Sequence, residues 1–261
     1  MLGIDISNWQ AGFDLSRTQG IDVTIFKATG GNSYVDKTCA GFVEQAKKNN
    51  KLWGFYHFAK DGCNSQSGKA EADFFYAHCK NYFGHGIPVL DLEDNGLNDW
   101  ATYTKAFIDR IHELTGIYPI IYTGLDGIRR CSTIPSILEN CPIWFAGYPL
   151  GYIGYWLHEK DNPRNYYSID ERAKIVMWQF TSAIKMQGYN VDSNLVYMTK
   201  QEWLDYAKGV KTVDNIGFEV WSYRNKALEK VDAYQILRDV RDAVKSIDKR
   251  LAVVEKKVGV K

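Results

Sequence analysis

The stretch IPVLDLED, residues 87–94, ends an apolar run with two acids separated by a single residue. Alternate side chains of a β-strand share a face, so Asp91 and Glu93 project together while Leu90 and Leu92 point to the other side. Two such carboxyl groups can divide acid–base work if one of them is partly buried and stays protonated near neutral pH. An isolated pair is more often solvated at a strand end, so this interpretation requires further acids at other strand ends.

The segments that must position these acids alternate between strand-like and helix-like patterns. We predict eight strands, at residues 2–7, 23–28, 52–59, 87–94, 118–123, 142–148, 174–181 and 189–196. Four well-formed helices are expected between them, including residues 36–49, a helix that ends near Tyr82, and a helix that Asn98 caps and Gly116 ends.

This order predicts an α/β fold, an irregular barrel related to the (β/α)₈ type whose last strands have few helices. In such barrels the functional site lies at the carboxyl ends of the strands. The aromatic segment 149–172 is too long for a plain connection, and we expect it to form one wall of a binding groove. A loop that packs on itself is an equally good interpretation.

The composition of the chain favours some classes of protein and argues against others. The chain has 261 residues, of which 45% are hydrophobic, 24% charged and 14% aromatic, and the high aromatic content favours flat ligands such as sugar rings. A formal net charge of +1 argues against nucleic-acid binding. We find no apolar run of 18 residues and no signal peptide, so we expect no membrane span and synthesis in a cytoplasm.

Eight short motifs, in order, carry a resemblance to a known family: GIDIS, FKATGG, GFYHFA, PVLDLED, IIYTG, WFAGY, WQFTS and NVDSN. Together they resemble the strand motifs of the family 25 glycoside hydrolases, the N-acetylmuramidases common among phage endolysins, over about Leu2 to Tyr206. The resemblance implies a (β/α)5β3 barrel of five β/α units and three further strands. It also implies hydrolysis of the β-1,4 bond between N-acetylmuramic acid and N-acetylglucosamine in bacterial peptidoglycan. One departure is Gly30, where the family often has an acid.

Matched residue by residue, the resemblance implies catalytic roles for Asp5, Asp91, Glu93 and Asp192. Glycosidic cleavage needs a proton for the leaving oxygen and a negative charge or nucleophile across the sugar ring. We expect Glu93 to be the acid, kept protonated by its acidic neighbours. Asp91 would orient or stabilise the substrate's 2-acetamido group if that group is the nucleophile. Asp192 and Asp5 remain candidates for direct attack or charge stabilisation.

Further side chains near the strand ends are expected to bind the substrate. Hydrogen bonding is expected from Tyr56, Tyr122 and Gln179, and stacking from Trp144, Tyr148 and Trp178. The alternative is that these residues form the inner packing layer of the barrel. Lys27 could pair with an acid rather than contact the substrate. His57 points away from Tyr56 in a regular strand, which favours a core histidine over a catalytic base.

Three other function classes fit less well. A chitinase-like enzyme needs further aspartates before the acidic pair, where this chain has Val89 and Gly86. A non-catalytic wall-binding protein on the same barrel would keep the aromatic residues and lose the acids. A metal-dependent deacetylase needs histidine ligands, and no histidine lies in the acid-bearing strands. We expect no metal and no cofactor.

The cysteines predict free thiols. Cys39, Cys63, Cys79, Cys131 and Cys141 form no CxxC pair and no zinc pattern, and their number is odd. Together with the absence of an export signal, this predicts no structural disulfide. Only Cys131 and Cys141, ten residues apart around a loop at Pro135, form a pair open to doubt.

The chain divides into a catalytic barrel at residues 1–209, a linker or small docking element at 210–230 and a helix at 231–261. A heptad seam is formed by Ala233, Leu237, Val240, Val244, Ile247, Leu251, Val254 and Val258. It predicts a coiled coil and a homo-oligomer, a tetramer first and a trimer or dimer next, although a helix packed on the barrel is the alternative. We expect the protein to act on the cell wall after its release.

Overall fold

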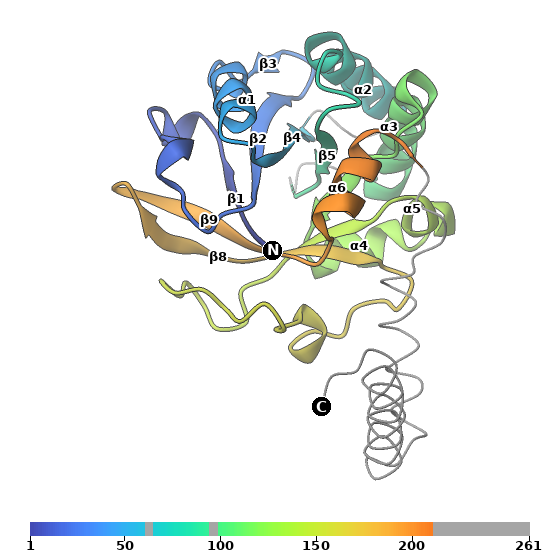
Figure 1. The fold of residues 1–261 in the computed structure, drawn as a ribbon. Helices are drawn as coiled ribbons and strands as arrows, with labels where there is room; N and C mark the ends of the chain where they lie inside the picture. Colours follow the sequence, from blue (N-terminus) through green and yellow to red (C-terminus); the bar gives the residue numbers. More distant parts are fainter. Residues whose placement is uncertain (61–64, 94–98, 211–261) are drawn as a thin grey trace, which may run out of the picture. The chain divides into compact units, whose positions relative to one another are not determined.

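The computed structural model describes residues 1–60, 65–93 and 99–210. Figure 1 shows strands that surround a central axis, with helices packed outside them. The strands are β1 (Leu2–Ile6), β2 (Val23–Gly30), β3 (Tyr34–Val35), β4 (Leu52–Phe58), β5 (Ile87–Asp91), β6 (Ile120–Thr123), β7 (Ile143–Ala146), β8 (Ile175–Met186) and β9 (Tyr189–Val196). The α-helices are α1 (Cys39–Lys48), α2 (Ser65–Cys79), α3 (Trp100–Thr115), α4 (Leu125–Cys131), α5 (Pro135–Asn140) and α6 (Lys200–Ala207). Short 3₁₀-helices are η1 (Asn8–Gln10), η2 (Leu15–Arg17) and η3 (Pro163–Asn165).

Eight of the strands close into a barrel in the order β1-β9-β8-β7-β6-β5-β4-β2, because β1 also pairs with β2. The pairs are parallel except those of β9, which runs antiparallel to both β8 and β1. A tight turn joins β8 to β9, where Gln187 and Gly188 both have positive φ, as primed hairpin turns require. This hairpin places β9 beside β1, and it is therefore the element that closes the barrel.

The predicted mixed α/β barrel is confirmed, and all eight predicted strands exist. Several details of the prediction are wrong. Asp36 does not begin the first helix, since its side chain accepts hydrogen bonds from Thr38 and from the backbone of Asn8. The cap of α3 is Asp99, one residue after the predicted Asn98, and its carboxylate accepts from Thr102 N at 3.0 Å. Pro135 starts helix α5 rather than a loop, a position that suits a residue without an N–H.

Two apolar layers hold the barrel together. The inner layer fills the barrel with residues such as Val23, Ile87 and Trp144, and the outer layer joins the barrel to the helices through Leu90, Leu92 and others. Leu90 and Leu92 thus point away from the barrel interior, as the alternation predicted.

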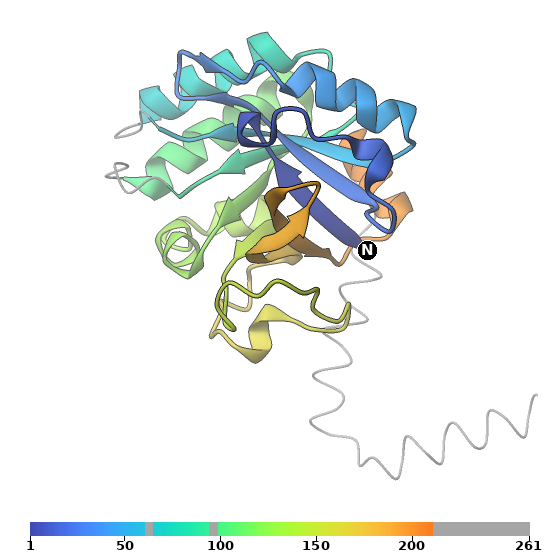
Figure 2. The same ribbon diagram turned by 90° about the vertical axis from the view of Figure 1, so that its left-hand side faces the viewer.

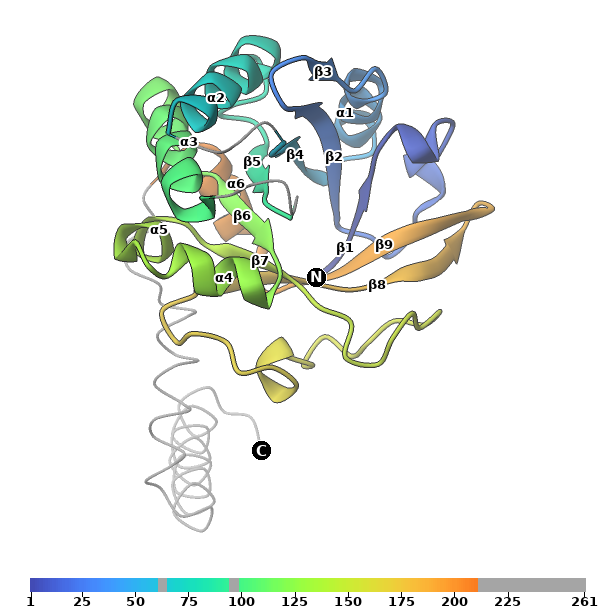
Figure 3. The same cartoon turned by 180° about the vertical axis from the view of Figure 1, so that it is seen from behind.

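Helix α6, which sequence reasoning did not predict, closes the amino-terminal end of the barrel. Trp203 of this helix is buried in the inner layer, and its Nε1 donates to the backbone oxygen of Trp53 at 3.2 Å, near the start of β4. The helix lies in front of the strands in Figure 1 and behind them in Figure 3. The opposite, carboxyl-terminal end of the barrel is therefore the end left for a binding site.

Helices cover the barrel unevenly. Figure 2 shows α1, α2 and α3 gathered on one side, while the long connection from β7 to β8 runs past the other side. Within this connection Trp156 packs on Phe180, with ring centroids 5.7 Å apart, and Tyr167 packs on Phe145 at 5.2 Å. Much of the segment 149–172 therefore serves as an aromatic cover for β7 and β8, in place of a helix.

His57 lies in the core, as predicted. Its Nδ1 is 2.8 Å from Thr29 Oγ1, and its Nε2 is 2.8 Å from Glu71 Oε2. Glu71 Oε2 also accepts from Tyr103 OH at 2.9 Å and from Lys60 N at 3.2 Å. This buried network joins β2, β4, α2 and α3.

The cysteines of the described ranges are free and buried: Cys39, Cys79, Cys131 and Cys141. The prediction of free thiols is confirmed for these four, including the pair Cys131 and Cys141. Cys63 lies outside the described residues.

Candidate active site

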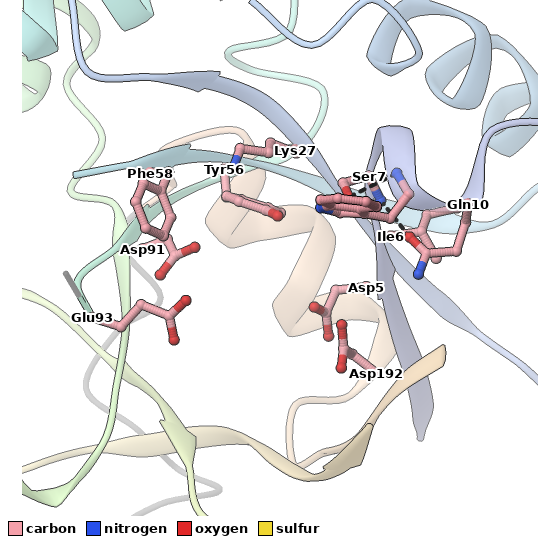
Figure 4. Close-up of a pocket in the computed structure, with 11 residues that line it drawn as sticks. Asp5, Ile6, Ser7, Gln10, Lys27, Tyr56, Phe58, Asp91, Glu93 and Asp192 are labelled. Carbon is pink, nitrogen blue, oxygen red and sulfur yellow. Dashed lines mark hydrogen bonds between the residues drawn. The ribbon is translucent and has the colours of Figure 1, made fainter. Parts of the chain in front are cut away.

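The barrel brings four acids together from three strands that are far apart in the sequence. Asp5 of β1 faces Asp192 of β9 in register, Asp91 is the last residue of β5, and Glu93 follows two positions later. Figure 4 shows Asp91 and Glu93 on one side of an opening and Asp5 and Asp192 on the other, with Tyr56 on the wall between them. The predicted gathering of acids is therefore present in the structure.

Two adjoining cavities meet at these acids. Their volumes are about 310 and 280 Å³, and five residues line both: Asp5, Tyr56, Asp91, Glu93 and Asp192. The first cavity continues toward Ser7, Trp9 and Gln10, and the second toward Tyr148 and Tyr152. The acids thus occupy the middle of a single cleft that extends to both sides of them.

Burial changes the proton affinity of these groups. Burial, followed by the charge of Asp192, raises the pKa of Asp5 well above its usual range, and burial, followed by the charge of Glu93, does the same for the pKa of Asp91. Burial and Glu93 also raise the pKa of Asp192 to about 6. Because the groups interact, they titrate as a cluster, and the cluster retains protons at a pH where isolated carboxyl groups are ionised.

Asp5 is held by two amides. Its Oδ1 accepts from Asn194 Nδ2 at 2.7 Å, and its two oxygens accept from Gln179 Nε2 at 3.1 and 3.2 Å. Gln179 Oε1 in turn accepts from the hydroxyl groups of Tyr122 and Tyr148. These bonds fix the orientation of the Gln179 amide, so the position of Asp5 depends on a network that crosses the barrel.

Asp91 has a different environment. It is 7% exposed, and within the described part of the chain its buried Oδ1 has no hydrogen-bond partner. The positive charge of Lys27 lowers the pKa of Asp91, against the larger effects of burial and of Glu93. The Nζ of Lys27 lies 4.5 Å from the ring centroid of Phe58. Asp91 therefore combines a buried oxygen that the described part of the chain leaves without a partner with a carboxyl group that lines both cavities.

The structure distinguishes the two members of the acidic pair by their burial. Glu93 is exposed in the cleft, whereas Asp91 is buried. The partly buried member, which burial favours as a proton carrier, is thus Asp91. The reason is that β5 ends at Asp91, so Glu93 lies beyond the packed wall of the barrel.

The other predicted site residues separate into two groups. Those that line the cleft are Lys27, Tyr56, Tyr122, Trp144, Tyr148 and Gln179. Trp178 does not line it: the side chain is fully buried in the outer layer, and its Nε1 donates to Gly147 O at 2.8 Å. Adjacent residues of a strand point to opposite sides, so an inward Gln179 requires an outward Trp178.

Trp144 lines the cleft but is not a stacking surface. Its side chain is 2% exposed, and Tyr122 packs against the ring edge-on with centroids 4.6 Å apart. Its Nε1 donates to Asn194 Oδ1 at 2.7 Å. Trp144 therefore supports the amide network below the acids. It belongs to the inner packing layer of the barrel, which was the alternative interpretation of its sequence position.

Sequence reasoning missed four residues that line the cleft, Trp9, Gln10, Phe58 and Ser182. It also missed the buried Asn194, which holds Asp5 in place. The position of Asn194, two residues after Asp192 on the same strand, could have identified it, because such residues share a face. Trp9 directly follows the first acidic strand and was overlooked because it lies beyond the strand pattern. Tyr152, from the aromatic segment, does reach the second cavity and packs edge-on to Tyr148 at 5.6 Å.

Known proteins resemble this chain in sequence. A sequence model described as "Glycosyl hydrolases family 25" matches residues 4–189. The N,O-diacetylmuramidase of Chalaropsis sp is 37% identical over 163 residues, which cover 53% of this chain and 76% of that protein. The lysozyme of Streptococcus phage Cp-7 is 28% identical over 229 residues, which cover 84% of this chain and 60% of that protein.

Solved structures share the fold. The bacterial lysozyme from Streptomyces coelicolor aligns with a TM-score of 0.66 at 22% identity and covers 80% of this chain and 98% of its own. The catalytic domain of the endolysin ply40 from bacteriophage P40 of Listeria monocytogenes aligns with a TM-score of 0.62 at 20% identity, over 80% of this chain and 97% of its own. No helix in the described ranges has the length and apolar character needed to cross a membrane.

Proposed function

Because the chain belongs to glycosyl hydrolases family 25 and is a peptidoglycan hydrolase of the lysozyme type, we propose that the four acids of the cleft cut the glycan strand. The bond is the β-1,4 link between N-acetylmuramic acid and N-acetylglucosamine. The observation that carries this proposal is the position of the acids, in the middle of a cleft that continues to both sides of them. A polymer bound along such a cleft is cut within its length.

Glu93 is the proposed general acid. Its carboxyl group is exposed in the cleft, so the oxygen of a departing sugar can reach it. The leaving oxygen requires a proton, and the interacting acids around Glu93 hold protons at a pH where isolated carboxyl groups are ionised.

Asp91 is proposed to position the substrate's 2-acetamido group. Its carboxyl group lines both cavities and is 7% exposed, so the accessible part of the group could accept an amide N–H of the substrate. An acetamido group held in this way can attack the anomeric carbon in place of an enzyme carboxylate, a known exception to the two-carboxylate scheme.

Asp5 and Asp192 are proposed to stabilise the positive charge that develops on the sugar ring. They face each other across the β1–β9 pair, opposite Asp91 and Glu93. Direct attack by either carboxylate is the alternative. Substrate-binding roles are proposed for the polar groups that line the cleft: Lys27, Tyr56, Tyr122, Tyr148 and Gln179.

The test is Glu93→Gln, which removes the acid and keeps the shape of the side chain. We expect clearing of cell-wall suspensions to fall by roughly 10²- to 10⁴-fold, the usual contribution of a general acid, with an unchanged melting temperature. Glu139→Gln, an exposed glutamate on α5 outside both cavities, is the matched control and should retain full activity. Near-normal clearing by Glu93→Gln would remove Glu93 from the acid role.

The remaining proposals rest on the sequence. We propose a catalytic barrel at residues 1–209, a linker or docking element at 210–230 and a coiled-coil helix at 231–261 that assembles a homo-oligomer, with a tetramer favoured. Residues 211–261 lie outside the described residues. Clustered sites on a repetitive wall would gain avidity. The protein is proposed to act on the bacterial cell wall after its release.

A further inference from the structure

Trp9 is the most exposed large hydrophobic residue of the described ranges, with 81% of its surface open to solvent. It lines the first cavity together with the acids, and it is absent from the second. Large aromatic side chains normally find burial in the core or at a binding surface. The exposure of Trp9 at the edge of the cleft therefore indicates a surface that a ligand covers.

The backbone that carries Trp9 is held in place. Ser7 and Gln10 cap η1 reciprocally, with Ser7 Oγ accepting from Trp9 N at 3.3 Å and Gln10 Oε1 accepting from Ser7 N at 3.0 Å. Figure 4 shows Ser7 and Gln10 beside the cleft.

Two neighbouring elements anchor the same turn. Asp36 Oδ2 accepts from Asn8 N at 3.0 Å, and Gln10 Nε2 donates to Asn190 O of β9 at 3.2 Å. Tyr34 OH also donates to Asn8 Oδ1 at 3.3 Å. A turn fixed from both sides loses little backbone entropy when a ligand binds, so the Trp9 backbone is already in place for binding.

The position of Trp9 along the cleft defines what it can contact. The acids lie between the first cavity, which contains Trp9, and the part of the second cavity that contains Tyr148 and Tyr152. A glycan cut at the acids extends into both cavities. A sugar on the first-cavity side therefore comes to Trp9 and not to the aromatic pair on the other side.

We infer that Trp9 is a stacking platform for one sugar of the glycan strand, on the first-cavity side of the cleavage point. The apolar face of a pyranose ring covers the exposed indole, and the contact is made equally in the bound substrate and in the transition state. This inference rests on the proposed function, because it assumes that the cleft binds a glycan. Trp9 then increases the affinity for the glycan and makes a long substrate necessary, but it takes no part in bond cleavage.

Steady-state kinetics on soluble, uncross-linked peptidoglycan strands test the inference. Trp9→Ala should raise KM roughly tenfold, as for the loss of one aromatic contact, and change kcat by less than about twofold, as expected for uniform binding. Trp9→Phe should recover most of the lost affinity. Tyr155→Ala, another exposed aromatic residue that lines neither cavity, should leave both constants unchanged.

A second measurement reports on contact directly. Iodide quenches the fluorescence of exposed tryptophans. The quenchable fraction is measured in the Glu93→Gln variant and in the same variant with Trp9→Phe added, and the difference between the two is the contribution of Trp9. Saturating glycan strands should protect that fraction. An unchanged KM in Trp9→Ala, or glycan that leaves the quenching of Trp9 unaltered, would overturn the platform while leaving the cleavage activity of the wild type intact. A wild type that releases no reducing ends would overturn the proposed function, and the platform with it.

Discussion

At the scale of single residues, the acids of the site lower the stability of the fold when they are ionised, and Asp192 is an example. An aspartate whose pKa is higher in the folded chain than in the unfolded chain binds its proton more tightly when folded. Its contribution to stability is therefore complete below the ordinary pKa of 3.8 and is lost as the pH rises through the folded value of about 6. The buried Asp5 and Asp91 act in the same direction.

Asp192→Asn should accordingly be more stable than the wild type at pH 7.5 and similar to it at pH 4. We expect a difference in unfolding free energy on the order of 1 kcal/mol at the higher pH, after allowing for solvent screening. Denaturant unfolding of both proteins at the two pH values measures it. A variant that is less stable at pH 7.5 would show that the Asp192 charge is favourable in the fold.

Asp91→Asn should separate activity from stability. The amide can neither stabilise positive charge on the acetamido group nor act as a base, so wall clearing should fall by roughly 10²-fold or more. The same change removes a buried carboxyl group with a raised pKa, and the melting temperature at pH 7.5 should rise or stay constant. Clearing assays and thermal melts on one preparation test both statements, and a variant that is active as well as folded would remove Asp91 from the chemistry.

Sequence reasoning found the acids because each lies within or just after an apolar strand, where period-two alternation assigns its face. The same rule was not applied to Trp178, which cannot share the inward face with its neighbour Gln179. Burial separated Asp91 from Glu93, and burial depends on where the strand leaves the barrel wall, which the sequence pattern does not show.

The network around Glu71 operates at the scale of elements. Glu71 is fully buried and bonds to His57 of β4, Tyr103 of α3 and the backbone of Lys60. Because Ala59 N also donates to Asp91 O at 2.9 Å, this network supports the chain beside the acidic strand.

Glu71→Ala should lower the unfolding free energy by about 3 kcal/mol, since removal of one partner leaves buried polar groups without compensation. Glu113→Ala on the surface of α3 provides the comparison, because its carboxylate is 65% exposed and its ion pair with Arg110 contributes little. Equal stability of the two variants in urea unfolding would contradict a structural role for the network.

The elements that sequence reasoning missed are those with weak local patterns. Strand β3 has only two residues and exists because it pairs with the end of β2. Helix α6 has eight residues, and its role depends on Trp203 entering a barrel end that only the closed fold creates. Tertiary contacts rather than local propensity determine such short elements.

At the scale of the whole molecule, the heptad seam bears on the oligomeric state. The seam at residues 233–258 predicts that the full chain is an oligomer at micromolar concentration. Light scattering after size exclusion should give the mass of a tetramer, and Val244→Asp with Leu251→Asp should reduce it to that of a monomer, since charges at core positions of a coiled coil are unfavourable. A full-length monomer, or an oligomer unaffected by both changes, would contradict a role of the seam in assembly.

The proposed function requires that this cleft cuts the glycan strand after muramic acid. Its most direct test is mass spectrometry of purified peptidoglycan digested by the protein and then reduced with borohydride, which labels each new reducing end. The new ends should be reduced muramic acid, and they should be absent with Glu93→Gln. New ends on reduced glucosamine, or cleaved peptides without new reducing ends, would contradict it.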